Sequence, residues 1–167
     1  MGPISLDISV DAPRERVFDF LSDLGIRSAW IDHFASEYRL ERIAARGQGA
    51  AARFRVDAPA GVRYMETVIA EADRPHRIVE HARGGRLDRL PLRIVWELEE
   101  GPTTRVSLTF WTLPAGPFDR LKELGRERWW RRRWKRALVR MRDLVESGEA
   151  PRGTGVAGGD RVPAVPA

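Results

Sequence analysis

The chain has 167 residues and a net charge of +5, with 29 basic and 24 acidic side chains. It contains no cysteine, which excludes disulfides, iron–sulfur clusters and thiolate zinc sites. It has no apolar segment of about 18 residues, and its first residues lack the pattern of a signal peptide. We therefore expect a cytoplasmic protein without a membrane-spanning helix.

The first part of the chain predicts a strand followed by two helices. Residues 4–10, ISLDISV, alternate apolar and polar side chains, as a half-buried strand does. Residues 14–24 place apolar side chains at helical spacing, namely Val17, Phe20, Leu21 and Leu24. Residues 26–35, IRSAWIDHFA, are interpreted as a second and shorter helical segment.

Six further strand-like segments occupy the middle of the chain. They are residues 38–44, 51–58, 62–72, 77–83, 92–100 and 104–112. Most alternate in hydrophobicity and are separated by turns that contain glycine or proline. Consecutive short strands of this kind favour an antiparallel sheet, whose apolar face must be covered by another element.

The last predicted element is an amphipathic helix from about residue 118 to residue 147. Its apolar stripe consists of Trp130, Trp134, Ala137, Leu138, Met141, Leu144 and Val145. The opposite, solvated face carries Arg128, Arg132, Arg136 and Arg140. Thirty residues give a helix of roughly 45 Å, unless Gly125 interrupts it. No other predicted element is large enough to cover the sheet.

These elements define the expected domain. Residues 148–167 are dominated by glycine, proline and alanine, which predicts a disordered tail. Residues 1–147 then form one α+β domain. In that domain a curved antiparallel sheet of about six or seven strands wraps around the long C-terminal helix, and two short helices follow the first strand.

Several segments resemble the START/SRPBCC superfamily, in its polyketide cyclase/dehydrase-like branch. The opening of that family is matched at Ala12, Pro13, Glu15, Val17, Phe18, Phe20, Leu21, Asp23 and Trp30. Residues 72–85, 95–111 and 137–147 resemble later parts of the same family. The resemblance covers about residues 3–148, and its specificity comes from the order and spacing of the segments.

The resemblance implies a helix-grip fold with a deep cavity between the sheet and the long helix. Members of this superfamily bind hydrophobic molecules such as lipids, sterols, polyketides and quinones, and some are aromatases or cyclases. The resemblance therefore implies a hydrophobic ligand for this chain, but it does not supply a reaction.

Nine residues are candidates for contact with such a ligand. They are Trp30, Phe34, Phe54, Tyr64, Glu66, Trp96, Phe110, Trp130 and Trp134. Glu66 is included because it shares a strand face with apolar residues, where a carboxylate is costly unless it is paired. The alternative is that this face meets solvent and that Met65, Thr67 and Ile69 point inward.

Glu66 and His81 are the candidate acid/base groups, should the protein be an enzyme. The alternation of their strand leaves open whether His81 or its neighbour Glu80 faces the cavity. We expect no metal, because the three histidines do not cluster with carboxylates as in a zinc site. We also expect no cofactor, because no glycine-rich phosphate loop is present.

The long helix also carries a candidate interaction surface. Trp129 lies outside the apolar stripe, close to Arg132, Arg133 and Arg136. The simpler interpretation is a surface tryptophan covered by arginine side chains, with a guanidinium stacked on the indole ring. The alternatives are contact with an anionic membrane, an oligomeric partner or nucleic acid, and among these partners nucleic acid is the least expected.

Three functions follow, in descending order. The first is the binding of a hydrophobic small molecule, such as a lipid, a quinone or a polyketide-like compound, by a monomer or homodimer. The second is a metal-free cyclase, dehydrase or aromatase in which the cavity holds a flexible substrate folded. The third is an interaction of the basic helix with an anionic membrane or nucleic acid. The polar residues are dispersed along the sequence, which favours binding over catalysis.

Overall fold

The computed structural model describes residues 2–58, 61–84, 90–113, 126–149 and 151. Its elements are β1 (Ile4–Val10), α1 (Arg14–Leu21), α2 (Ser28–Ile31), β2 (Ala35–Leu40), β3 (Ala51–Ala58), β4 (Gly61–Asp73), β5 (Arg77–Gly84), β6 (Leu90–Glu99), β7 (Thr104–Thr112) and α4 (Arg126–Ser147). The predicted order of elements is confirmed. Residues 118–125 of the predicted helix and most of the predicted tail lie outside the described residues.

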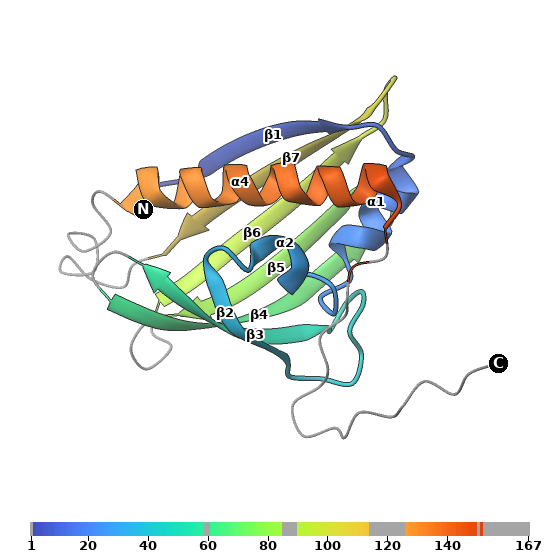
Figure 1. The fold of residues 1–167 in the computed structure, drawn as a ribbon. Helices are drawn as coiled ribbons and strands as arrows, with labels where there is room; N and C mark the ends of the chain where they lie inside the picture. The colour runs from blue at the N-terminus through green and yellow to red at the C-terminus, as the bar shows by residue number, and fades with distance from the viewer. Residues whose placement is uncertain (1, 59–60, 85–89, 114–125, 150, 152–167) are drawn as a thin grey trace.

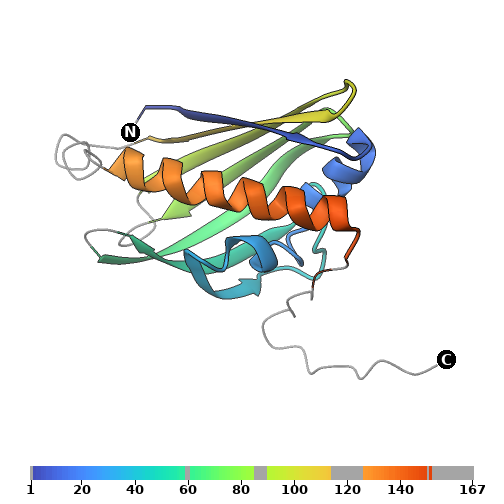
Figure 2. The same cartoon turned by 45° about the horizontal axis from the view of Figure 1, so that its top comes forward.

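Seven strands form one antiparallel sheet in the order β1-β7-β6-β5-β4-β3-β2. The first strand returns to pair with the last, so that Ile4 lies opposite Phe110 and Val10 opposite Thr104. The sheet curls around α4, and α1 and α2 lie on the same side of it as α4 (Figures 1 and 2). This is the predicted α+β helix-grip architecture.

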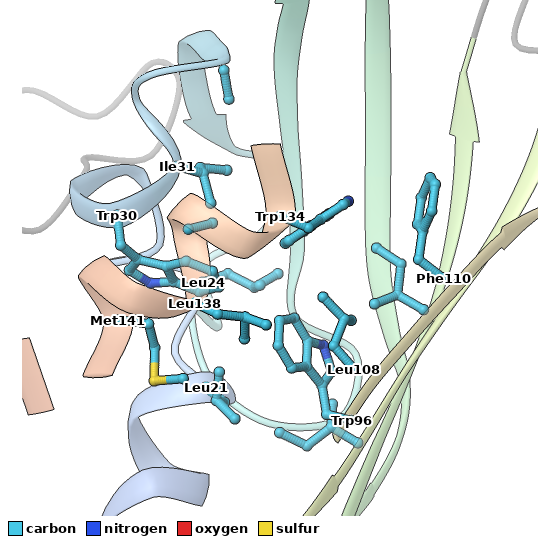
Figure 3. Packing of buried hydrophobic residues seen from close by; sticks show 14 of the residues in the cluster. Leu21, Leu24, Trp30, Ile31, Trp96, Leu108, Phe110, Trp134, Leu138 and Met141 are labelled. Atoms are coloured by element: carbon cyan, nitrogen blue, oxygen red, sulfur yellow. The ribbon is translucent and has the colours of Figure 1, made fainter. Parts of the chain in front are cut away.

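The inner face of the sheet is apolar because the strands keep a period of two. Every second residue of β6 and β7 is buried against α4, as the sequence predicts: Leu92, Ile94, Trp96, Leu98, Val106, Leu108 and Phe110. Figure 3 shows part of this core, in which Trp134, Leu138 and Met141 descend from α4 towards the side chains of β6 and β7. A single hydrophobic core therefore joins the helix to the sheet.

The apolar stripe of α4 is oriented as predicted. Trp130, Trp134, Ala137, Leu138, Met141 and Val145 are buried, and Leu144 is partly buried. Arg128, Arg132 and Arg136 are exposed on the opposite side.

Arg140 corrects the prediction for the opposite face of the helix. It is only partly exposed, forms an ion pair with Asp32 and donates a hydrogen bond to the carbonyl oxygen of Ala29, 3.1 Å away. The reason is tertiary, because α2 packs beside α4 and supplies these acceptors.

The two sides of α4 can be distinguished by their contribution to stability. Leu138→Ala should lower the free energy of unfolding by about 2–5 kcal/mol, because the removed atoms leave a cavity in the core. Val139 is the next residue and is 37% exposed, so Val139→Ala should change that free energy by less than about 0.5 kcal/mol. Urea unfolding followed by tryptophan fluorescence measures both. Equal losses in the two variants would contradict this orientation of α4.

Candidate functional site

Trp134 lies at the centre of an aromatic cluster between α4 and the sheet. Its ring centroid is 5.5 Å from that of Phe34, 5.9 Å from that of Trp96 and 6.1 Å from that of Phe110. Trp130, one turn earlier on α4, lies 5.1 Å from Phe110. Most of these ring pairs are tilted or edge-to-face, which is a favourable geometry for aromatic rings.

The cluster extends towards α2 and β3. Trp30 meets Trp96 edge-to-face at 6.0 Å, and Phe54 stacks on Tyr38 at 5.6 Å. The inward orientation predicted for the aromatic ligand candidates is therefore found for Trp30, Phe34, Phe54, Trp96, Phe110, Trp130 and Trp134, all of which are buried. Their contact with a ligand stays a prediction.

Two indole groups in this cluster carry a buried N–H without an acceptor. Nε1 of Trp30 and Nε1 of Trp134 have no hydrogen-bond partner among the described residues. In Figure 3 the nitrogen of Trp134 lies on the edge of the ring that points towards the side of Phe110. Buried donors are normally paired, and an unpaired one costs about 1–3 kcal/mol. Each of these groups can therefore donate to an oxygen that enters the interior.

A buried ion pair lies at one end of the aromatic cluster. Arg27, between α1 and α2, donates from Nη1 to Oε2 of Glu80 on β5 over 2.6 Å, and the side chains are only 2% and 0% exposed. The second terminal nitrogen of Arg27 donates to the carbonyl oxygen of Leu21 over 2.9 Å. The guanidinium also faces the rings of Trp30 and Trp96, with Cζ 5.6 and 5.9 Å from their centroids.

Both carboxylate oxygens of Glu80 are engaged. Oε2 accepts from Oγ1 of Thr67 at 2.9 Å as well as from Arg27, and Oε1 accepts from the indole Nε1 of Trp96 at 2.7 Å. A buried carboxylate is stable as the charged form only when it is paired and hydrogen-bonded in this way. Glu80 therefore acts as a structural anion that holds Arg27 and the indole ring of Trp96 in place.

The surroundings of the pair favour its charged state. Burial opposes the charge of Arg27, but Glu80 outweighs that effect and raises the pKa of the guanidinium above its ordinary value. Burial also raises the pKa of Tyr38, so its hydroxyl is protonated at neutral pH and donates to the carbonyl oxygen of Leu24 at 2.9 Å. The interior thus contains one ion pair and neutral donors.

The predicted inward orientation of Glu66 and Tyr64 is wrong. Both side chains are exposed on the outer face of β4, and the hydroxyl of Tyr64 donates to Oε2 of Glu37 at 2.8 Å. The alternative stated from the sequence holds instead, because Met65, Thr67 and Ile69 are buried. Both faces of β4 carry apolar residues, so alternation alone did not determine which face meets the helix.

His81 also lies on the outer face, and its neighbour Glu80 is the residue that points inward. The sequence left both possibilities open. Pairing decides between them, because His81 lies between Val68 of β4 and Arg93 of β6, both on the outer face. A strand face is fixed by its neighbours in the sheet and not by its own residues alone.

Sequence reasoning missed Arg27. It lies in an irregular segment where periodicity carries no information, and an arginine is most often exposed. Only the fold brings the loop after α1 over Glu80 of β5, and no local pattern signals a contact between positions 53 residues apart.

The other histidines do not form a metal site. His33 lies between α2 and α4, where its Nε2 is 3.1 Å from the carbonyl oxygen of Arg133. Burial lowers the pKa of His33 despite this contact, and the nearby guanidinium groups of α4 lower it further. His76 is exposed, 3.9 Å from a carboxylate oxygen of Asp73. Within the described ranges, no three histidine or carboxylate side chains cluster as metal ligands.

The proposed interaction surface on α4 is partly engaged within the molecule. The guanidinium of Arg133 lies 5.4 Å above the ring of Trp129, as the stacking interpretation predicts, and also donates to the carbonyl oxygen of His33 at 3.4 Å. Trp129 itself contacts Phe34 at 6.5 Å. Contact of this surface with a membrane or nucleic acid stays a prediction. In the described part of the chain, no helix is both long and apolar enough to cross a bilayer.

The fold and its interior define a helix-grip protein, and comparison with known families is consistent with this class. The model of the family described as "polyketide cyclase / dehydrase and lipid transport" matches residues 1–146. The chain therefore belongs to this family, which confirms the relationship inferred from the sequence. No protein of curated function matches the chain at a significant level.

Several solved structures share the fold. KanY has a TM-score of 0.69 and 21% identity, and the match covers 87% of this chain and 99% of KanY. A protein from Thermus thermophilus, TTHA0849, has a TM-score of 0.65 and 16% identity, covering 89% of this chain and all of that protein (100%). DynU16, a protein in the dynemicin biosynthetic locus, has a TM-score of 0.61 and 17% identity over 92% of this chain and 50% of its own. At these identities the similarity shows the fold alone.

The buried ion pair yields a prediction about stability. Arg27→Met should lower the free energy of unfolding by about 3–5 kcal/mol, because it leaves the Glu80 carboxylate buried without its cation. The double variant Arg27→Met/Glu80→Met should recover much of that loss. Denaturant unfolding measures both, with Arg74→Met as the control, since Arg74 pairs with the exposed Asp19. A single variant as stable as the parent protein would contradict this account.

Proposed function

We propose that this protein binds a hydrophobic small molecule between the concave face of the sheet and α4. The family supports a role in hydrophobic-ligand binding or cyclisation. The side chains that face this region are aromatic and come from α2, β6, β7 and α4. Aromatic and apolar walls with a few placed polar groups are typical of small-molecule sites.

The observation that carries the proposal is the pair of buried indole donors. Nε1 of Trp30 and Nε1 of Trp134 lack acceptors within the described chain, and an oxygen atom of a ligand would satisfy them. A planar molecule with a carbonyl or hydroxyl oxygen fits this combination of aromatic walls and donors. Of the expected ligand classes, quinones and polyketide-like compounds are therefore favoured over saturated lipids.

Catalysis by the same site is the second candidate. The family includes cyclases and dehydrases by description, and a site can promote cyclisation by holding a flexible chain folded. Proton transfer would need a free acid or base. Glu80 is the inward carboxylate in the described sheet, and its oxygens already accept from Arg27, Thr67 and Trp96. This engagement supports binding before catalysis.

The two candidates differ in the fate of the ligand. We would extract whatever co-purifies with the protein, identify it by mass spectrometry, and incubate it again with fresh protein. An unchanged ligand supports the binding function. Loss of one water molecule or formation of a new ring, absent in a control with heat-denatured protein, would establish the cyclase or dehydrase function instead.

The indole donors make the binding proposal testable with a matched pair of probes. 2-Acetonaphthone carries a carbonyl oxygen, whereas 2-ethylnaphthalene has nearly the same shape without it. We expect the ketone to bind more tightly. Trp134→Phe should weaken ketone binding by about two- to tenfold, the worth of one hydrogen bond, and leave the binding of the hydrocarbon nearly unchanged. Equilibrium dialysis measures both dissociation constants.

Trp111→Phe is the control for this experiment, because Trp111 lies on the outer face of β7 beneath the guanidinium of Arg93. It removes an indole donor from the opposite side of the sheet and should not alter either dissociation constant. If neither probe binds to the parent protein, or if both variants weaken both probes equally, the proposed interior site is wrong.

A further inference from the structure

The outer face of the sheet carries a groove that the proposed function does not use. It has a volume of about 650 Å³ and lies over β4, β5 and β6, on the side of the sheet away from α4. Its polar lining residues are Glu66, His81, Arg83 and Arg93, and its apolar ones include Val68 and Leu113. The two residues that the sequence suggested as acid/base candidates therefore meet here and not in the interior.

Strand pairing sets these side chains in two rows across the sheet. In the first row His81 of β5 lies between Val68 of β4 and Arg93 of β6. In the second row Arg83 of β5 lies next to Glu66 on β4. Neighbouring strands are about 4.8 Å apart and alternate residues about 6.8 Å. The two guanidinium groups thus project from adjacent strands and can reach one ligand group.

Arg93 is held in position without a counter-ion. Its guanidinium carbon lies 5.7 Å from the centroid of Trp111, and its Nε is buried and has no acceptor among the described residues. Within the described chain, neither Arg83 nor Arg93 forms an ion pair with a carboxylate, although many other arginines do, such as Arg55 with Glu37. Both guanidinium groups remain available to an anion from outside.

We propose that this groove is a second binding site, which takes a small molecule with one carboxylate or phosphate group and an apolar body. The planar guanidinium matches the oxygens of either group, and two such donors from adjacent strands favour bidentate contacts. The apolar body lies over Val68 and Leu113. Glu66, at the β4 side of the groove, repels a second anionic group and so restricts the ligand to one. This site is independent of the interior one.

The proposal predicts substitutions with opposite effects. Benzoate and phenyl phosphate serve as probes, and amide shifts in two-dimensional NMR spectra give the dissociation constants. Arg93→Gln and Arg83→Gln should each weaken binding by about tenfold, the worth of a charge-assisted hydrogen bond. Glu66→Gln should tighten binding by about twofold, because it removes a negative charge from the groove.

Arg105→Gln is the matched control, because Arg105 is exposed on β7, whereas Arg93 lies on β6 and pairs with Trp111 near the opposite end of β7. It should leave both constants unchanged, and thermal unfolding checks that each variant is folded. Binding of both probes supports recognition of any anionic oxygen group, whereas binding of one alone identifies the carboxylate or the phosphate as the recognised group. Shifts that do not saturate, or equal constants in all four variants, would overturn the proposal.

Discussion

The structure depends on the burial of the concave sheet face by α4. Seven strands with one apolar face cannot persist in water uncovered, and α4 carries the apolar stripe that matches this face. Trp130 and Trp134 provide most of the contact, since each touches aromatic rings from the sheet or from the segment after α2. The same aromatic contacts that stabilise the fold form the walls of the proposed interior site.

The Arg27–Glu80 pair adds a polar constraint to this apolar interior. It joins the loop after α1 to the centre of the sheet and orients Trp96 through a hydrogen bond. A buried pair of this kind is costly to form and costly to break, so it specifies one arrangement of its neighbours more than it adds stability. Because Glu80 is saturated with donors, the interior offers donors to a ligand and no free carboxylate among the described residues of the sheet.

The two faces of the sheet are therefore chemically different. The inner face combines aromatic rings with unpaired indole donors, which suits an uncharged molecule with an acceptor oxygen. The outer face presents Arg83 and Arg93 around a groove, which suits an anion. Strands of period two make this division possible, because adjacent residues such as Glu80 and His81 belong to opposite sides.

The sequence by itself determined the order of elements, the antiparallel sheet, the buried stripe of α4 and most of the interior aromatics. Each of these follows from local periodicity, and one strong apolar face leaves a single orientation. Tertiary structure decided what periodicity could not. β4 has apolar residues on both faces, so only its pairing placed Glu66 outside and Thr67 inside. Arg27 met Glu80 only because the folded chain brings distant segments together, and such a contact has no local signature in the sequence.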